Sequence, residues 1–289
     1  MSPQLIAFIV LVVINFMLIV GMVFLERKDP KSCIAWALSF LVLPFVSWFI
    51  YIMVGKGPKF SKRRWSKRKQ LADKKLEQRL KNGDFNFYEG SNNENSQIVK
   101  LNYYYGGSPC QSNNEVEFFI DAHEMYDRQL EDIKNAAESI NVMYYLFKTD
   151  AAGKALRDAL IEKAKQGVKV NVVYDSSGNL KTNLYFFRDL IKAGGKVHPF
   201  FPSIFKLINS NFCYRNHRKI VVIDGKIGYI GGMNIGVDYL SQDKRIKPWR
   251  DTHLRIVGES VCMLQTRFIK DFTCSSKRAI IDDDITPFF

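Results

Sequence analysis

The chain has few of the residues from which disulfide frameworks and metal sites are built. Its 289 residues include only five cysteines and four histidines, and no two cysteines form a C-x-x-C pair. An odd cysteine count without that spacing argues against both a disulfide framework and a zinc site, and reduced thiols suit a cytoplasmic domain.

Acidic residues are missing from one stretch, Lys56 to Lys69, which carries eight basic residues. These account for eight of the thirteen net positive charges of the chain. The stretch directly follows an apolar segment, a position that favours contact with anionic lipid headgroups over a purely solvated linker. Nucleic acid is the other partner that such charge can attract. No interleaved aromatic platform is evident, so we expect no nucleic acid to bind.

Two long apolar runs precede the basic stretch. Leu5–Leu25 is uncharged and long enough to cross the hydrocarbon core as a helix, with Asn15 as its one strongly polar residue. Cys33–Val54 is a second run, which we expect Pro44 to kink. Together they predict a transmembrane helical hairpin over residues 1–56. We expect Asn15 to form a hydrogen bond between helices.

The charge distribution orients this hairpin. Because the heavily basic flank follows residue 55, the positive-inside rule places that flank and the N-terminus in the cytoplasm of a multi-pass membrane protein. Residues 57–114 read as a basic juxtamembrane segment and linker, which includes a charged surface helix at 70–81. A compact domain is expected over residues 115–289.

Strand and helix patterns alternate through that domain, which predicts an α/β fold with a mixed, partly parallel sheet flanked by helices. His123 falls in the apolar stripe of the first expected helix, so we expect a packed core histidine there and not a ligand. The expected strands are 140–147, 168–174, 196–200 and 252–257, and the expected helices are 116–137, 150–167, 180–193 and 259–272.

The most informative stretch is 216–234, which reads N-H-R-K-I-V-V-I-D-G-K-I-G-Y-I-G-G-M-N. Two apolar strand-like runs joined by Asp224 and Gly225 predict a β-hairpin, with His217 and Lys219 on one face. An imidazole can act as nucleophile or as general acid and base, and a lysine ammonium suits a phosphate oxygen. Asn234 adds a neutral donor. The set fits metal-free attack on a phosphodiester, although an isolated histidine in a hairpin can also be structural.

The spacing H-x-K-x4-D-x6-G-G-x-N resembles the HKD signature of the phospholipase D superfamily. The signature includes His217, Lys219, Asp224 and Asn234, although the position of Asp224 at the turn favours a bracing role for it. A catalytic imidazole needs a partner for its second nitrogen, and in this superfamily an acidic residue downstream supplies it. Asp251 is the best match here, with a surface aspartate as the alternative.

The resemblance extends to bacterial cardiolipin synthases and covers both apolar runs and much of the α/β domain. It implies a phospholipase D-type catalytic repeat at the bacterial cell membrane, with Met143 standing where many relatives carry an acidic residue. The segments that carry the resemblance are 27–38, 43–56, 150–160, 163–170 and 249–258.

That family transfers a phosphatidyl group between two phosphatidylglycerol molecules, releasing glycerol. The resemblance implies a phosphohistidine intermediate on one of two histidines, with Lys219 and Asn234 on the non-bridging oxygens and the anionic lipid surface as partner. No cofactor and no metal are implied.

One departure from the family is large, because its members carry two such motifs and only His217 begins an H-x-K here. We expect the second motif to come from a longer chain or, less favoured, from a homodimer partner, so that residues 1–289 alone are nearly inactive. His217 and Lys219 should then both be exposed in an open groove. A membrane-tethered homodimeric phosphodiesterase or nuclease, and a non-catalytic membrane remnant, are the alternatives.

Overall fold

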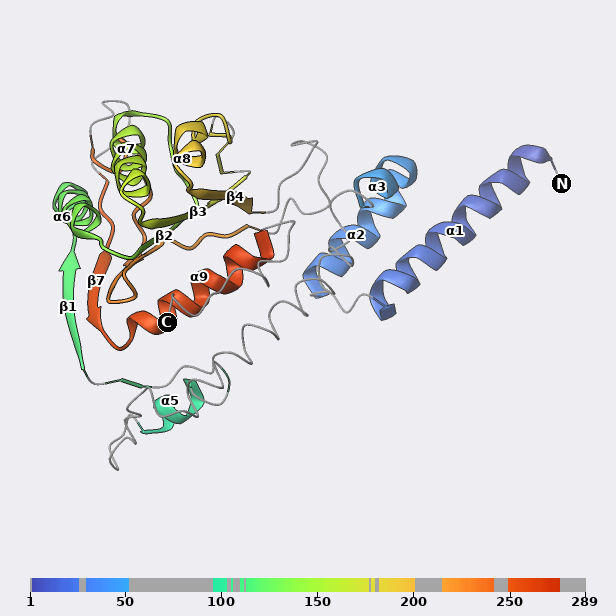
Figure 1. Cartoon of the computed structure of the whole chain (residues 1–289). Coiled ribbons are helices and arrows are strands. Elements are labelled where there is room, and N and C mark those ends of the chain that lie inside the picture. The colour runs from blue at the N-terminus through green and yellow to red at the C-terminus, as the bar shows by residue number, and fades with distance from the viewer. Residues whose placement is uncertain are drawn as a thin grey trace. The chain divides into compact units, whose positions relative to one another are not determined.

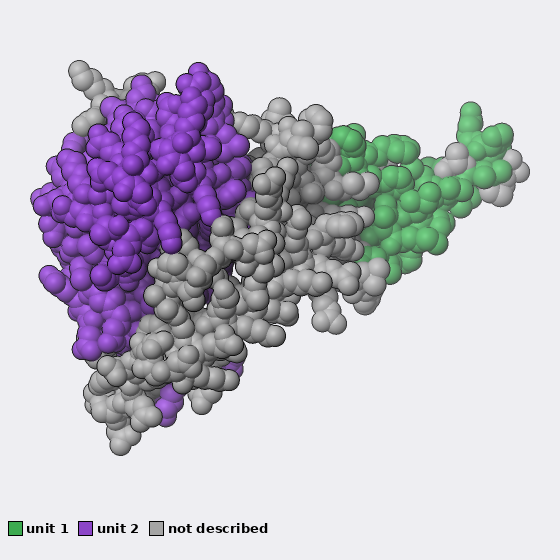
Figure 2. Space-filling view, viewed as in Figure 1, with its two compact units in different colours: residues 1–59, 205–213 green, residues 60–204, 214–289 purple. Residues whose placement is uncertain are grey.

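The computed structural model describes residues 2–25, 30–51, 96–102, 105, 110–111, 113–176, 178–179, 182–200, 215–241 and 249–275. The chain divides into two compact units, coloured separately in Figure 2: residues 1–59 with 205–213, and residues 60–204 with 214–289. The basic stretch at 56–69 and the expected helix at 70–81 lie outside the described residues.

The first unit contains α1 (Pro3–Leu25), α2 (Pro30–Val42) and α3 (Pro44–Ile50). Among the described residues, α1 is the one helix long and apolar enough to cross a membrane, over Pro3–Gly21. The second apolar run is divided at Leu43, next to Pro44, as expected from a residue that cannot continue the hydrogen-bonding of a helix. Because α2 has only 13 residues, the second span of the predicted hairpin is not shown.

A buried polar contact joins the helices of this unit. The side-chain carbonyl of Asn15 accepts a hydrogen bond of 2.8 Å from the indole N–H of Trp48. Trp36 and Phe40 each pack edge-on against Tyr51, and these rings belong to the same apolar cluster as Trp48. An unpaired amide in such apolar surroundings would be destabilising. The predicted interhelical role of Asn15 is confirmed.

The second unit is built on a seven-stranded sheet in the order β1-β7-β6-β5-β2-β3-β4 (Figure 1). Strands β2, β3 and β4 pair in parallel, and the other neighbours pair antiparallel. This confirms the predicted mixed, partly parallel sheet. The strands are β1 (Asn114–Phe119), β2 (Ser139–Tyr144), β3 (Lys169–Asp175), β4 (Lys196–Phe200), β5 (Ile220–Ile223), β6 (Ile227–Gly231) and β7 (His253–Gly258).

Helices cover both faces of the sheet. Figure 1 shows α6 (Ala122–Asn135), α7 (Ala151–Lys165) and α8 (Arg188–Lys192) on one side and α9 (Val261–Ser275) on the other. The surroundings of strand β5 explain why its sequence is apolar throughout. Val221 and Ile223 join the core beneath α6 and α7, whereas Ile220 and Val222 join the core beneath α9. A strand with helices on both faces has no solvated side.

The first expected helix of this unit is wrong at its start. Residues 114–119 form β1, which pairs with β7, and α6 begins only after Asp121, whose carboxylate caps it by accepting from the N–H of His123. His123 is exposed and its Nε2 lies 2.9 Å from the carbonyl oxygen of Leu240, so the predicted core histidine is also wrong. Pairing with a strand more than a hundred residues away outweighed the local helical spacing.

The helix expected at 180–193 is shorter than predicted. Helix α8 covers only Arg188–Lys192, because Asn183 accepts hydrogen bonds from the N–H groups of Tyr185 and Phe186 and forms a local turn instead. The neighbouring helix α7 agrees with expectation, since Asp150 caps its start. The linker contains one described helix, α5 (Ser96–Leu101).

Candidate active site

The predicted hairpin forms, with Asp224 and Gly225 at its turn. Both have positive φ, 52° and 65°, and are the central residues of a turn closed by the hydrogen bond from the Lys226 N–H to the Ile223 carbonyl oxygen, while the strand register pairs Ile223 with Ile227. The Asp224 carboxylate accepts from the backbone N–H groups of Ala137, Glu138 and Ser139, at 2.7–2.8 Å. Asp224 thus joins the hairpin to the connection between α6 and β2, at the end of β5 away from His217, and the structure does not bring it to the other site residues.

His217 and Lys219 do come together, just before β5 begins. The Lys219 Nζ lies 3.1 and 3.2 Å from the two ring nitrogens of His217, and it donates to the His217 carbonyl oxygen at 2.8 Å. His217 is exposed, as expected, but Lys219 is only 2% exposed. The expectation that both would be open is therefore wrong for Lys219, because its side chain folds back beneath the histidine.

Burial and charge set the protonation states of this pair. Partial burial and the neighbouring Lys219 ammonium lower the pKa of His217 below 6.5, against the opposing effect of Asp175 and Asp251. Burial lowers the pKa of Lys219 to about 8, and Asp251 again opposes the shift. At neutral pH the imidazole is therefore uncharged and the ammonium is charged. A neutral imidazole beside a fixed cation is a nucleophile placed next to a group that can stabilise a phosphate oxyanion.

Asp251 lies against the glycine pair at the end of the second hairpin strand, where the absence of side chains makes room for it. A Cβ at Gly232 would lie 1.9 Å from Asp251 Oδ1, and a Cβ at Gly231 would lie 2.5 Å from the Thr252 carbonyl oxygen. No other residue type fits either position without displacing its neighbour. The Asp251 charge opposes the lowering of the pKa of both His217 and Lys219.

Asn234 is buried and its side-chain amide is engaged within the domain. Its Oδ1 accepts from the N–H of Leu146 at 3.0 Å, and its Nδ2 donates to the hydroxyl of Tyr239 at 2.6 Å. The amide therefore links the segment after β6 to the segment after β2. Through that link it fixes the chain next to Tyr145.

The sequence reasoning assigned Tyr145 no role, yet its ring lies against the pair. Its centroid is 4.6 Å from that of His217 and 5.5 Å from Lys219 Nζ. The aromatic face favours the cation electrostatically and limits the orientations of the imidazole. The sequence signal that could have indicated Tyr145 was its position just after a buried parallel strand, because ligand sites form at the carboxyl ends of such strands.

His253 is a second histidine close to the site, and it is completely buried. Neither ring nitrogen has a hydrogen-bond partner among the described residues, and burial lowers its pKa to about 4. It is therefore uncharged at neutral pH. The described part of the chain contains no group of three His, Cys, Asp or Glu side chains placed to hold a metal ion.

Known proteins resemble this chain over most of its length. Residues 130–245 match the family described as "Cardiolipin synthase, PLD-like domain". The chain is 38% identical to "Cardiolipin synthase" of Oceanobacillus iheyensis over 276 residues, which are 93% of this chain and 57% of that protein. It is 36% identical to "Major cardiolipin synthase ClsA" of Bacillus subtilis over 269 residues, 91% of this chain and 56% of that protein.

The chain thus spans little more than half the length of these curated relatives. Among solved structures, NucT from Helicobacter pylori is similar with 20% identity and a TM-score of 0.43, over 55% of this chain and 96% of that one.

Proposed function

The chain belongs to the phospholipase D superfamily through a PLD-like domain of the cardiolipin synthase kind, and we propose that it is the part of a cardiolipin synthase that carries the first catalytic histidine. The observation that carries the proposal is the neutral, exposed His217 with the buried Lys219 ammonium against its ring. The likeness to curated cardiolipin synthases covers more than nine-tenths of the chain, and the chain has an apolar N-terminal helix, α1; both favour a lipid substrate.

In the first half of the proposed reaction, a ring nitrogen of His217 attacks the phosphorus of phosphatidylglycerol. The new N–P bond replaces the bond to the glycerol oxygen, and the leaving glycerol takes a proton from a second histidine. Lys219 stabilises the negative charge on the non-bridging oxygens, and Asp251 favours the positive charge that develops on the imidazole.

In the second half, the free hydroxyl of another phosphatidylglycerol attacks the phosphohistidine. The second histidine, now neutral, accepts the hydroxyl proton, and the N–P bond breaks to release cardiolipin and restore His217. The second histidine belongs to a second HKD motif, which further sequence of the same protein or a second copy of the chain supplies. No step requires a metal ion.

We propose a multi-pass membrane protein whose catalytic domain faces the bacterial cytoplasm. The apolar helix α1 and the strongly basic stretch at 56–69 support this placement, because positive segments remain on the cytoplasmic side and are attracted to anionic lipid.

The test is product analysis by mass spectrometry on vesicles of phosphatidylglycerol, with residues 1–289 alone and with the gene's complete reading frame. We expect cardiolipin and glycerol in equal amounts when both motifs are present, and none from the His217→Ala variant. Cleavage of DNA with no cardiolipin would instead support a nuclease. Robust synthesis by a stable dimer of residues 1–289 would overturn the preference for a longer chain.

A further inference from the structure

The backbone that carries His217 is not held by the sheet. Strand β5 begins at Ile220, and residues 215–219 form no regular strand. Asn216 is nevertheless only 2% exposed. Side-chain hydrogen bonds therefore fix the segment from which His217 projects.

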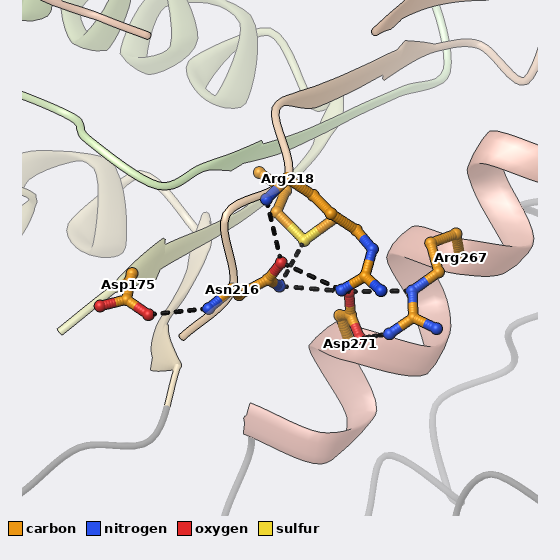
Figure 3. A network of polar contacts seen from close by, with 6 residues as sticks. Asp175, Asn216, Arg218, Arg267 and Asp271 are labelled. Atoms are coloured by element: carbon orange, nitrogen blue, oxygen red, sulfur yellow. Dashed lines mark hydrogen bonds and ion pairs between the residues drawn. The ribbon is translucent and has the colours of Figure 1, made fainter. Parts of the chain in front are cut away.

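Two buried carboxylates hold Asn216 from different elements. Its backbone N–H donates to Asp175 Oδ2 at the end of β3, at 3.0 Å, and its side-chain Nδ2 donates to Asp271 Oδ2 of α9, at 3.1 Å (Figure 3). The sulfur of Met143 also lies 3.1 Å from Nδ2, so the methionine at the position where relatives carry an acid contacts this same amide.

Asp271 also binds the residue on the other side of the histidine. Arg218 Nη1 lies 3.3 Å from Asp271 Oδ2, and Arg218 donates through both its backbone N–H and Nη1 to Asn216 Oδ1. Arg267, one turn before Asp271 in α9, pairs with the same carboxylate. Figure 3 shows these side chains converging on Asp271 from the segment and from the helix.

We propose that Asp271 is a positioning residue for His217, which it fixes by anchoring both flanking residues, Asn216 and Arg218. This rests on the proposed function only in that His217 is the nucleophile. Displacement of a reacting group by about 1 Å can cost about a hundredfold in rate, so rigid support at a distance from the chemistry has catalytic value.

Stability alone does not account for a carboxylate at this position. Asp271 is 0% exposed and lies between the apolar Phe268 and Phe272, on the face of α9 that packs on the sheet. Replacing a buried ion pair by apolar residues is often neutral or stabilising. A carboxylate here has the specific consequence that α9 is linked to the histidine segment.

A donor–acceptor exchange tests the link directly. Asn216→Asp sets two carboxylates against each other, and Asp271→Asn removes the charge that binds both arginines. We expect each to lower kcat about 10- to 100-fold with little change in KM, because a displacement of the nucleophile by about 1 Å can cost about a hundredfold in rate. The double variant Asn216→Asp/Asp271→Asn restores one donor and one acceptor with unchanged net charge, and we expect it to recover most of the loss.

The matched control is Asp132→Asn, which alters another buried carboxylate that pairs with an arginine, Arg255, away from the histidine segment. We expect a stability loss there without the fall in kcat. All variants are compared at a temperature at which circular dichroism shows them folded. Asn216→Ala is the substitute should Asn216→Asp not fold.

A second readout does not need turnover. Carbethoxylation of the four histidines by diethyl pyrocarbonate, followed by mass spectrometry, reports how the His217 ring is presented. We expect the single variants to change the rate at His217 selectively, and the exchanged pair to restore it. The positioning role is overturned if, in the single variants, neither the carbethoxylation rate at His217 nor kcat changes more than in Asp132→Asn. It is also overturned if the double variant restores neither quantity. Turnover is measured with both motifs present; if that wild-type protein makes no cardiolipin, the proposed function fails, while the labelling still decides this inference.

Discussion

Replacing Lys219 should make the protein more stable and far less active. The Lys219 side chain is buried beneath His217, and burial lowers its pKa from 10.5 to about 8, so the fold disfavours the charged form. That decrease, which already includes the opposing effect of Asp251, corresponds to roughly 3 kcal/mol, and solvent screening reduces it to about 1–3 kcal/mol. Lys219→Met keeps the aliphatic volume and removes the cation, so we expect it to unfold at a higher denaturant concentration at pH 7.

The pH dependence supplies the sign of this effect. The folded state binds the Lys219 proton less tightly than the unfolded state does, so the destabilisation is fully present below about pH 8 and disappears above 10.5. The stability gained in Lys219→Met should therefore shrink between these pH values. Activity should fall roughly 10²- to 10³-fold, the usual cost of removing one group that stabilises developing charge.

Urea titrations of wild type and Lys219→Met at pH 7 and pH 10, with cardiolipin formation measured in parallel, provide the check. If Lys219→Met is less stable than wild type at pH 7, or if its gain in stability does not depend on pH, the claim that burying the Lys219 ammonium destabilises the fold is refuted. A rate loss under threefold would show that Lys219 does not contact the phosphate.

Three further predictions follow from the same geometry. Gly232→Ala should displace the Asp251 carboxylate and lower kcat about 10- to 100-fold. Gly228→Ala, whose Cβ would lie 2.7 Å from the end of the Leu264 side chain and at ordinary contact distance from Val261, should leave kcat unchanged; equal rates of the two variants in steady-state assays would argue against the site geometry. Burial lowers the pKa of His253 from 6.5 to about 4, so the free energy of unfolding should fall by roughly 3 kcal/mol as the pH falls between these values. Acid titrations of His253→Leu should lack that loss. A loss that persists in this variant would contradict the claim that His253 is buried without charge. Neutralising the basic residues of 56–69 should weaken attachment to anionic vesicles by about 1 kcal/mol per charge; equal binding to neutral vesicles would exclude a lipid-facing role.

Local patterns predicted the elements that depend mainly on local physics. The β5–β6 hairpin followed from its turn dipeptide, and the start of α7 followed from Asp150. The break at Pro44 and the Asn15–Trp48 hydrogen bond followed from what proline and a lone amide do in apolar helices.

Elements that depend on distant partners were not predictable in this way. Strand β1 carries a spacing compatible with a helix and became a strand through pairing with β7. Helix α8 begins later than expected because the Asn183 side chain accepts hydrogen bonds from the N–H groups of Tyr185 and Phe186. Local spacing does not report either kind of competition.

The site shows the same division. The spacing of the motif was enough to bring His217 and Lys219 together, whereas the approach of Asp251 to Gly232 became visible only in the structure. The support of His217 by Asp271 was not visible in the sequence, because it joins residues 55 positions apart whose types are ordinary by themselves. The burial of Lys219 likewise depends on the packing around it.

The central claim is that His217 is the nucleophile of a phosphatidyl transfer, and the most direct measurement is to trap the intermediate. The protein, with both motifs present, is mixed with phosphatidylglycerol, quenched in alkali within one turnover, digested and mapped by mass spectrometry. The account predicts a phosphatidyl group on a ring nitrogen of His217, absent from His217→Ala. Two results would contradict it: cardiolipin formation with the phosphatidyl adduct on another residue and none on His217, or full activity in His217→Ala.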